Sequence, residues 1–186
     1  MQQSRKKLIV LSSILVLAAI SRLIPHPMNF APLAAMALFG AAYFGNRGLG
    51  LLVTMGAWFL SDLVLNNLVY DFGTGFQLFT SGAFYIYLSV ALIFGIGALI
   101  LKKISFPRIV IGSFIASILF FLVSNFGVWS QGIMYPMTTE GLIACYIAGL
   151  PYIQNTLMGD LFFSVILFFL YERLLGANLI PKRISK

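Results

Sequence analysis

Two aspartates and an arginine stand at the ends of apolar stretches, and they are the side chains most able to do chemistry. Asp62 and Asp160 each lie near one end of a hydrophobic run, and Arg22 lies at the end of another. Ionisable groups at that depth are costly in lipid, so we expect them to face the protein interior and to pair. The pattern predicts an ion pair of Arg22 with Asp62 or Asp160, contacts from these groups to a ligand, or both.

The segment 21–32 is the point around which the chain is organised. It contains the only histidine, His26, together with Pro25, Pro27 and Pro32. Proline removes a backbone donor and restricts the residue before it, so this segment is not expected to be ordinary helix. We expect it to form one wall of a binding site. His26 is interpreted either as a structural, hydrogen-bonded residue or as a ligand contact.

Further polar side chains lie near the ends of the other apolar runs. Asp62 and Asn66 are four residues apart and share a helix face, as do Asn125 and Trp129. Nearby aromatic residues could stack on a flat ligand or form an interfacial belt. The candidate substrate-binding residues are Arg22, His26, Asn29, Asp62, Asn66, Asn125, Trp129, Tyr135, Asn155 and Asp160.

Motifs typical of catalytic or metal sites are missing from the sequence. It has no His-Glu-x-x-His pattern, no phosphate-binding glycine loop and no pair of cysteines. We therefore predict a protein that is not an enzyme and that has no metal site or resident cofactor.

The composition is that of an integral membrane protein. Hydrophobic residues make up 60% of the 186 residues and charged residues 9%, against about 25% charge in a soluble domain. We predict an all-α fold, one transmembrane domain over residues 1–186. A retained first span is expected, with a signal peptide ending near Ala19 as the alternative. Residues 139–150 are too short to cross and predict a re-entrant or interfacial helix. The expected spans are about 8–24, 32–45, 49–66, 83–101, 109–129 and 155–175.

The charges predict how the chain lies in the bilayer. Six spans put both termini on one side, and every lysine and arginine except Arg22 then falls on that side. Asp62, Asp71, Glu140 and Asp160 fall at the opposite face. By the positive-inside rule the termini are cytoplasmic, so the net charge of +7 does not indicate nucleic-acid binding. A polar layer confined to the outer face indicates a pocket rather than a channel, which would be polar through its depth.

Five short motifs carry a resemblance to a known family. They are Arg22-Leu-Ile-Pro-His-Pro-Met-Asn-Phe-Ala-Pro, Ala37-Leu-Phe-Gly, Ser61-Asp62-Leu, Ser124-Asn125-Phe-Gly-Val-Trp129 and Asn155-Thr-Leu-x-Gly-Asp160. Over nearly its whole length the chain resembles an uncharacterised bacterial membrane family assigned to transport. That family is similar to the substrate-binding S components of energy-coupling factor (ECF) transporters.

This resemblance implies six helices and a ligand bound near the outer face by the loops at about 24–31, 67–81 and 130–154. It implies a vitamin-like micronutrient as substrate, a transmembrane coupling subunit and ATPase subunits as partners, and the bacterial plasma membrane as location. One branch of solitary S-like proteins handles cobalamin, so His26 or Cys145 is a candidate to face cobalt in a cobalamin-type ligand.

One pattern departs from the S components, which usually carry Ala-x-x-x-Ala on the first span. Here that spacing occurs at the second span, at Ala31/Ala35 and Ala37/Ala41, which leaves the partner open. The predicted function is a membrane-embedded, micronutrient-binding subunit. The alternatives are an intramembrane enzyme acting on a lipid-like substrate, and a non-catalytic assembly or sensor protein.

Overall fold

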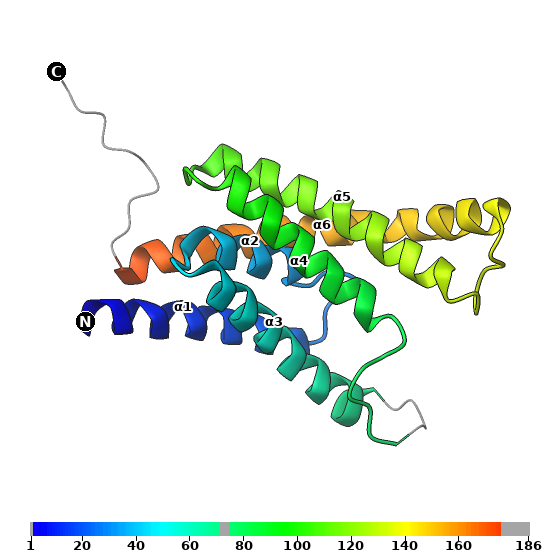
Figure 1. The fold of residues 1–186 in the computed structure, drawn as a ribbon, viewed down its shortest axis with the longest axis horizontal. Coiled ribbons are helices and arrows are strands. Elements are labelled where there is room, and N and C mark those ends of the chain that lie inside the picture. Colours follow the sequence, from blue (N-terminus) through cyan, green and yellow to red (C-terminus); the bar gives the residue numbers. More distant parts are fainter. Residues whose placement is uncertain (1, 71–74, 176–186) are drawn as a thin grey trace.

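Every regular element in residues 2–70 and 75–175, the part of the chain that the computed structural model describes, is a helix (Figure 1). The long apolar runs fold as helices because each satisfies its own backbone hydrogen bonds. The elements are α1 (Gln2–Ile20), the 3-10 turn η1 (Ser21–Leu23), α2 (Leu33–Tyr43), α3 (Arg47–Val64), the π-helical turn η2 (Leu65–Val69), α4 (Ala83–Ile100), α5 (Phe106–Ser130) and α6 (Thr139–Leu175).

Four of the described helical segments are long and apolar enough to cross a membrane. They are Arg47–Val69, Ala83–Ile100, Phe106–Ser130 and Thr139–Leu174. The prediction of an all-helical protein with the properties of a membrane-embedded chain is confirmed at this level. Two further spans were expected, near residues 8–24 and 32–45. The first corresponds to α1, which starts with basic residues, and the second to α2, which is short.

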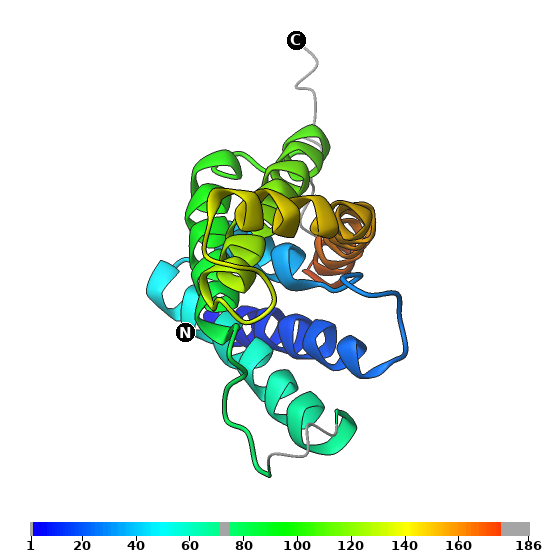
Figure 2. The same ribbon diagram turned by 90° about the vertical axis from the view of Figure 1, so that its right-hand side faces the viewer.

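Helix α2 lies at the centre of the bundle and contacts each of the other five α-helices (Figure 2). It has 11 residues, which at 1.5 Å per residue is about half of a bilayer core of roughly 30 Å. Every residue of α2 except Ala42 is buried. Its alanines and glycine leave room for close approach of the surrounding helices. The second expected span is therefore a short helix buried at the centre of the bundle.

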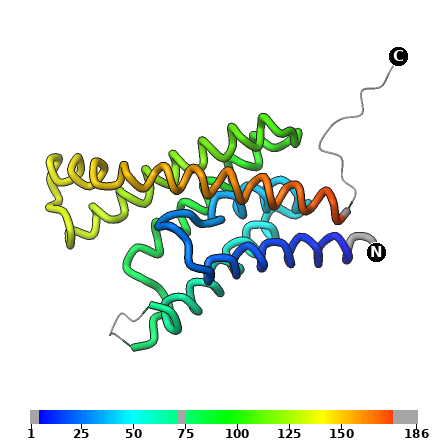
Figure 3. The backbone as a smooth tube through the Cα atoms, turned by 180° about the vertical axis from the view of Figure 1, so that it is seen from behind, coloured from blue at the N-terminus to red at the C-terminus, as the bar shows by residue number. Residues whose placement is uncertain are grey.

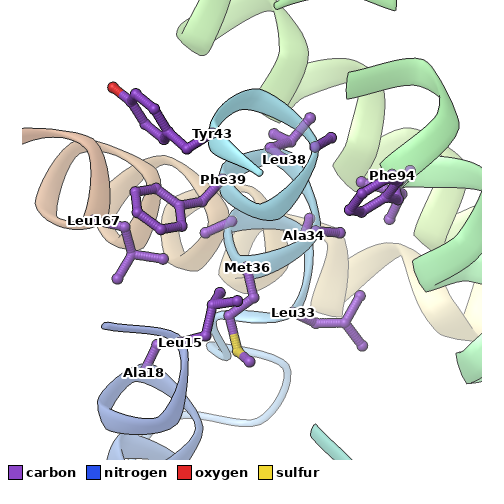
Figure 4. Close-up of a cluster of buried hydrophobic side chains, with 14 of the residues drawn as sticks. Leu15, Ala18, Leu33, Ala34, Met36, Leu38, Phe39, Tyr43, Phe94 and Leu167 are labelled. Atoms are coloured by element: carbon purple, nitrogen blue, oxygen red, sulfur yellow. The ribbon is translucent and has the colours of Figure 1, made fainter. Parts of the chain in front are cut away.

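The half of α2 near its C-terminus is packed by large side chains. Phe39 lies 5.0 Å from the ring of Tyr43 and 5.6 Å from that of Phe168, and both Tyr43 and Phe39 contact Tyr171 on α6. Figure 4 shows Phe39 of α2 beside Leu167 of α6, with Leu15 of α1 on another side of α2. This aromatic cluster holds α2 against α6.

The structure corrects the prediction for residues 139–150. In place of a separate re-entrant or interfacial helix, they form the first part of α6, which is helical through Pro151 to Leu175 (Figures 1 and 3). Tyr146 donates through its hydroxyl to the Leu122 carbonyl at 2.7 Å, and Cys145 Sγ lies 3.3 Å from the Asn125 carbonyl oxygen. These contacts keep the first part of α6 against α5. A proline inside a helix is tolerated when neighbouring helices hold the segment in place.

The bundle has two unlike ends, seen at the left and right of Figure 1. At the terminal end lie the start of α1, the turns 44–46 and 101–105, and the last described residues of α6. At the loop end lie residues 131–138 and 75–82, with residues 24–32 on the same side but nearer the middle of the bundle. The described basic residues other than Arg22 belong to the terminal end, as the charge pattern predicts. Asp71, Lys182, Arg183 and Lys186 lie outside the described residues.

Candidate functional site

Arg22 forms the predicted ion pair with Asp62. Its Nη1 lies 2.7 Å from Asp62 Oδ1, and both side chains are largely buried, at 13% and 17% exposure. The same Nη1 donates to the Ser61 hydroxyl, and the guanidinium lies over the ring of Trp58, 3.5 Å from its centroid. Tyr87 of α4 donates to Asp62 Oδ2 at 3.3 Å. The pair therefore joins η1 at the end of α1 to α3 and α4.

Asp160 is placed differently, because α6 carries it to the N-terminus of α2. Its side chain is 2% exposed and accepts from the Ser117 hydroxyl of α5 at 2.6 Å and from the backbone N–H of Ala34. Ala34 lies in the first turn of α2, where backbone N–H groups have no partner inside the helix. Pro32 at the N-cap supplies no side-chain cap. Asp160 therefore caps α2 from another helix, where the helix dipole stabilises a negative charge.

Two adjoining cavities open among these residues at the loop end. The charged cavity, of about 210 Å³, is lined by Arg22, His26 and Asp160 together with Trp58 and Tyr70. The neutral cavity, of about 260 Å³, lies between α4, α5 and α6. Its walls share hydroxyl, amide and aromatic groups: Tyr85, Phe121, Ser124, Asn125, Gln131 and Tyr152.

The two cavities have a common wall. Asn29, Ile86, Phe120 and Thr156 line both of them. Together the cavities have the size of a small-molecule site, for which roughly 300–1,000 Å³ is typical. The arrangement provides charge at one end and uncharged hydrogen-bonding groups beside aromatic faces at the other.

The connection between η1 and α2, which was expected to form one wall of a binding site, lines both cavities through Asn29. Asn29 adopts a positive φ of 63°, a conformation that asparagine tolerates better than most residues. His26 is exposed and lines the charged cavity, and its Nδ1 lies 2.9 Å from the Pro27 carbonyl oxygen. Asn155 of α6 donates to the Met28 carbonyl at 3.0 Å, which fixes this connection on the bundle. Asn155 thus positions the wall and does not line either cavity.

Three other predicted residues lie outside both cavities. Trp129 uses its indole N–H for the carbonyls of Pro136 and Thr138, at 3.1 and 3.2 Å, so it fixes the α5–α6 connection. Tyr135 belongs to that connection and lines neither cavity, and Asn66 lines neither. The structure therefore brings Arg22, His26, Asn29, Asn125 and Asp160 together around the cavities, with Asp62 behind Arg22.

Cys145 also lies outside both cavities. It is 2% exposed, points to the Asn125 carbonyl and lines neither cavity. The expectation that it faces a ligand is not met by this placement.

Sequence reasoning missed the partners that hold the charged groups. Trp58, Ser61 and Tyr87 surround the Arg22–Asp62 pair, and Ser117 holds Asp160. A signal for Ser117 was present, because Ser113 and Ser117 are four residues apart on one face of α5, in its apolar middle part. Ser113 donates to Ser164 of α6 at 2.9 Å, next to the Asp160 contact.

Comparison with known proteins places the chain in a family but supplies no activity. No curated protein and no solved structure matches it. The model of a family of unknown function, DUF6580, matches residues 2–182. The chain therefore belongs to the family DUF6580.

Proposed function

We propose that this protein is a membrane-embedded binding subunit for the uptake of a small, vitamin-like micronutrient. The observation that carries the proposal is the pair of adjoining cavities at the loop end, which join Asp160 and Arg22 to an uncharged, aromatic-walled space. Binding sites of this size are mostly apolar, with few polar groups placed to fix the orientation of the ligand.

The contrast between the two ends of the bundle supports a pocket in preference to a channel. Near the terminal end the interior is filled by Phe39, Tyr43, Phe168 and Tyr171. A conduction pathway would need polar lining through the full depth of the protein. A ligand that enters from the loop end would stop at α2.

The remaining parts of the proposal concern the membrane. All six α-helices would lie in the bacterial plasma membrane with both termini cytoplasmic, since basic residues on the terminal end follow the positive-inside rule. The cavities would then open outward. The sequence resemblance to S components favours delivery through a coupling subunit with two ATPases.

Ligand binding by the purified protein in lipid nanodiscs tests the proposal. We expect a molecule of the vitamin class to raise the thermal midpoint of unfolding and to co-purify in mass spectrometry. Phe120→Trp should abolish both effects, because Phe120 is part of the wall common to both cavities and a larger ring would fill them.

Phe114→Trp is the matched control, since Phe114 is 42% exposed on the same helix and lines neither cavity. A panel of vitamins, precursors and metal chelates that gives no stabilisation and no uptake phenotype would refute the proposal.

A further inference from the structure

We infer that the ligand is an organic cation, a protonated amine or a positively charged heterocycle, whose charge is held by Asp160. This inference rests on the proposed function and names the class of substrate for the same site.

The charges that line the charged cavity do not balance. Arg22 is neutralised by Asp62 at 2.7 Å. No nitrogen of a described lysine, arginine or histidine lies within 4.0 Å of an Asp160 oxygen. A buried carboxylate without a cationic partner is costly, so a cationic ligand in this cavity would be favoured by the free energy of completing the pair.

The existing partners of Asp160 leave room for this contact. A carboxylate has about four acceptor positions, and the described partners are the Ser117 hydroxyl and the Ala34 N–H. The N-terminus of α2 contributes about half a positive charge. Asp160 is only 2% exposed, yet it lines the charged cavity. A ligand bound in this cavity would therefore contact a carboxylate that is largely shielded from water.

The other cavity walls suit an organic cation. Phe120 and Tyr70 line the same cavity as Asp160, and aromatic faces attract cations, more strongly when water is excluded. The Trp58 ring is already covered by Arg22, but its buried indole N–H has no partner among the described residues. A cation that also carries a hydrogen-bond acceptor would satisfy both Asp160 and this N–H group.

The test uses the full-length protein in nanodiscs and the small-molecule extract of cells that express it. The extract is separated on ion-exchange resins into cation-retained, anion-retained and unretained fractions. Each fraction is added to the protein while its thermal unfolding is recorded. We expect stabilisation by the cation-retained fraction, and at least a tenfold larger amount of that fraction to be needed for Asp160→Asn.

Glu172→Gln is the matched control, because it makes the same acid-to-amide change on α6 at a residue that lines neither cavity. This variant should respond to the fractions as the wild type does.

Stabilisation only by the anion-retained or unretained fraction overturns the cation inference but keeps the proposed function. The cation inference is also overturned if the cation-retained fraction stabilises Asp160→Asn as well as it stabilises the wild type. A wild-type protein that responds to no fraction overturns both proposals. If Asp160→Asn does not fold, the comparison of fractions on the wild type decides the question alone.

Discussion

The two ends of helix α2 are held in opposite ways. At its C-terminal end, Phe39 and Tyr43 pack directly onto Phe168 and Tyr171, with ring centroids 4.0–5.7 Å apart. At its N-terminal end, Ala34 meets the carboxylate of Asp160, and a cavity of about 210 Å³ lies alongside. One end is tightly packed and the other carries polar groups beside empty space. The packed end therefore supplies stability, and the polar end is where the proposed ligand would bind.

The largest effect should come from breaking the packed end. Phe39 is 0% exposed, and Phe39→Ala should lower the free energy of unfolding by about 3–5 kcal/mol through lost contacts and a residual cavity. Thermal unfolding in nanodiscs measures this change. Phe169→Ala is the control, because Phe169 is 54% exposed on α6 and should change little. Equal losses of unfolding free energy in both variants would contradict the claim that packing at the C-terminal end of α2 supplies stability.

Breaking the Arg22–Asp62 pair should have the next largest effect. Arg22→Ala leaves a mostly buried Asp62 unpaired, which should cost about 3 kcal/mol of unfolding free energy. The double variant Arg22→Ala/Asp62→Ala should recover part of that loss, since no buried charge then remains. A double-mutant cycle on thermal or denaturant unfolding measures the coupling. Losses that simply add would contradict a direct pairing of the two side chains.

The close approach of α6 to the site wall can be tested at Gly159. A Cβ there would lie 3.1 Å from the backbone N of Ala31 and from Cα of Phe30. Because backbone atoms cannot rotate away, Gly159→Ala should displace the wall and cost about 1–3 kcal/mol, as overpacking does. Ligand binding should weaken as well.

The matched control for this change is Gly95→Ala, since a Cβ at Gly95 of α4 meets no atom within 4 Å. That variant should be neutral or slightly more stable, because alanine favours a helix over glycine. A loss at Gly95 equal to that at Gly159 would rule out the proposed steric cause.

The smallest effect concerns Trp129. Trp129→Phe removes the indole donor to Pro136 and Thr138 and should cost about 1 kcal/mol, the usual net worth of one hydrogen bond. Since Trp129 lines neither cavity, ligand affinity should stay within twofold of wild type in a binding titration. A tenfold loss of affinity with unchanged stability would instead return Trp129 to the binding site.

Much of the architecture could be predicted because apolar length and proline position are local properties of the sequence. The break at residues 21–32, the turn at Asn46 and the gathering of candidate residues at one end of the bundle all follow from them. The pairing of Arg22 with Asp62 was one of two options, and the choice depended on how α1 packs against α3.

The failures involve contacts between distant segments. Residues 139–150 were expected to form a helix of their own, but they continue through Pro151 into α6, and contacts of Cys145 and Tyr146 hold this part of α6 against α5. Trp129 and Asn155 were chosen for their residue type and position, yet the α5–α6 connection and the Met28 carbonyl occupy their polar atoms. Helix periodicity cannot reveal such partners.

The outward opening of the cavities is the central claim, and cysteine accessibility in intact cells tests it most directly. Cys145 is replaced by serine, and single cysteines are placed by Met28→Cys and Met137→Cys at the loop end, where these residues are 68% and 63% exposed, and by Lys103→Cys at the terminal end. A membrane-impermeant maleimide should label the first two in intact cells and the third only after lysis. Labelling of Lys103→Cys in intact cells, with Met28→Cys and Met137→Cys protected until lysis, would contradict the account.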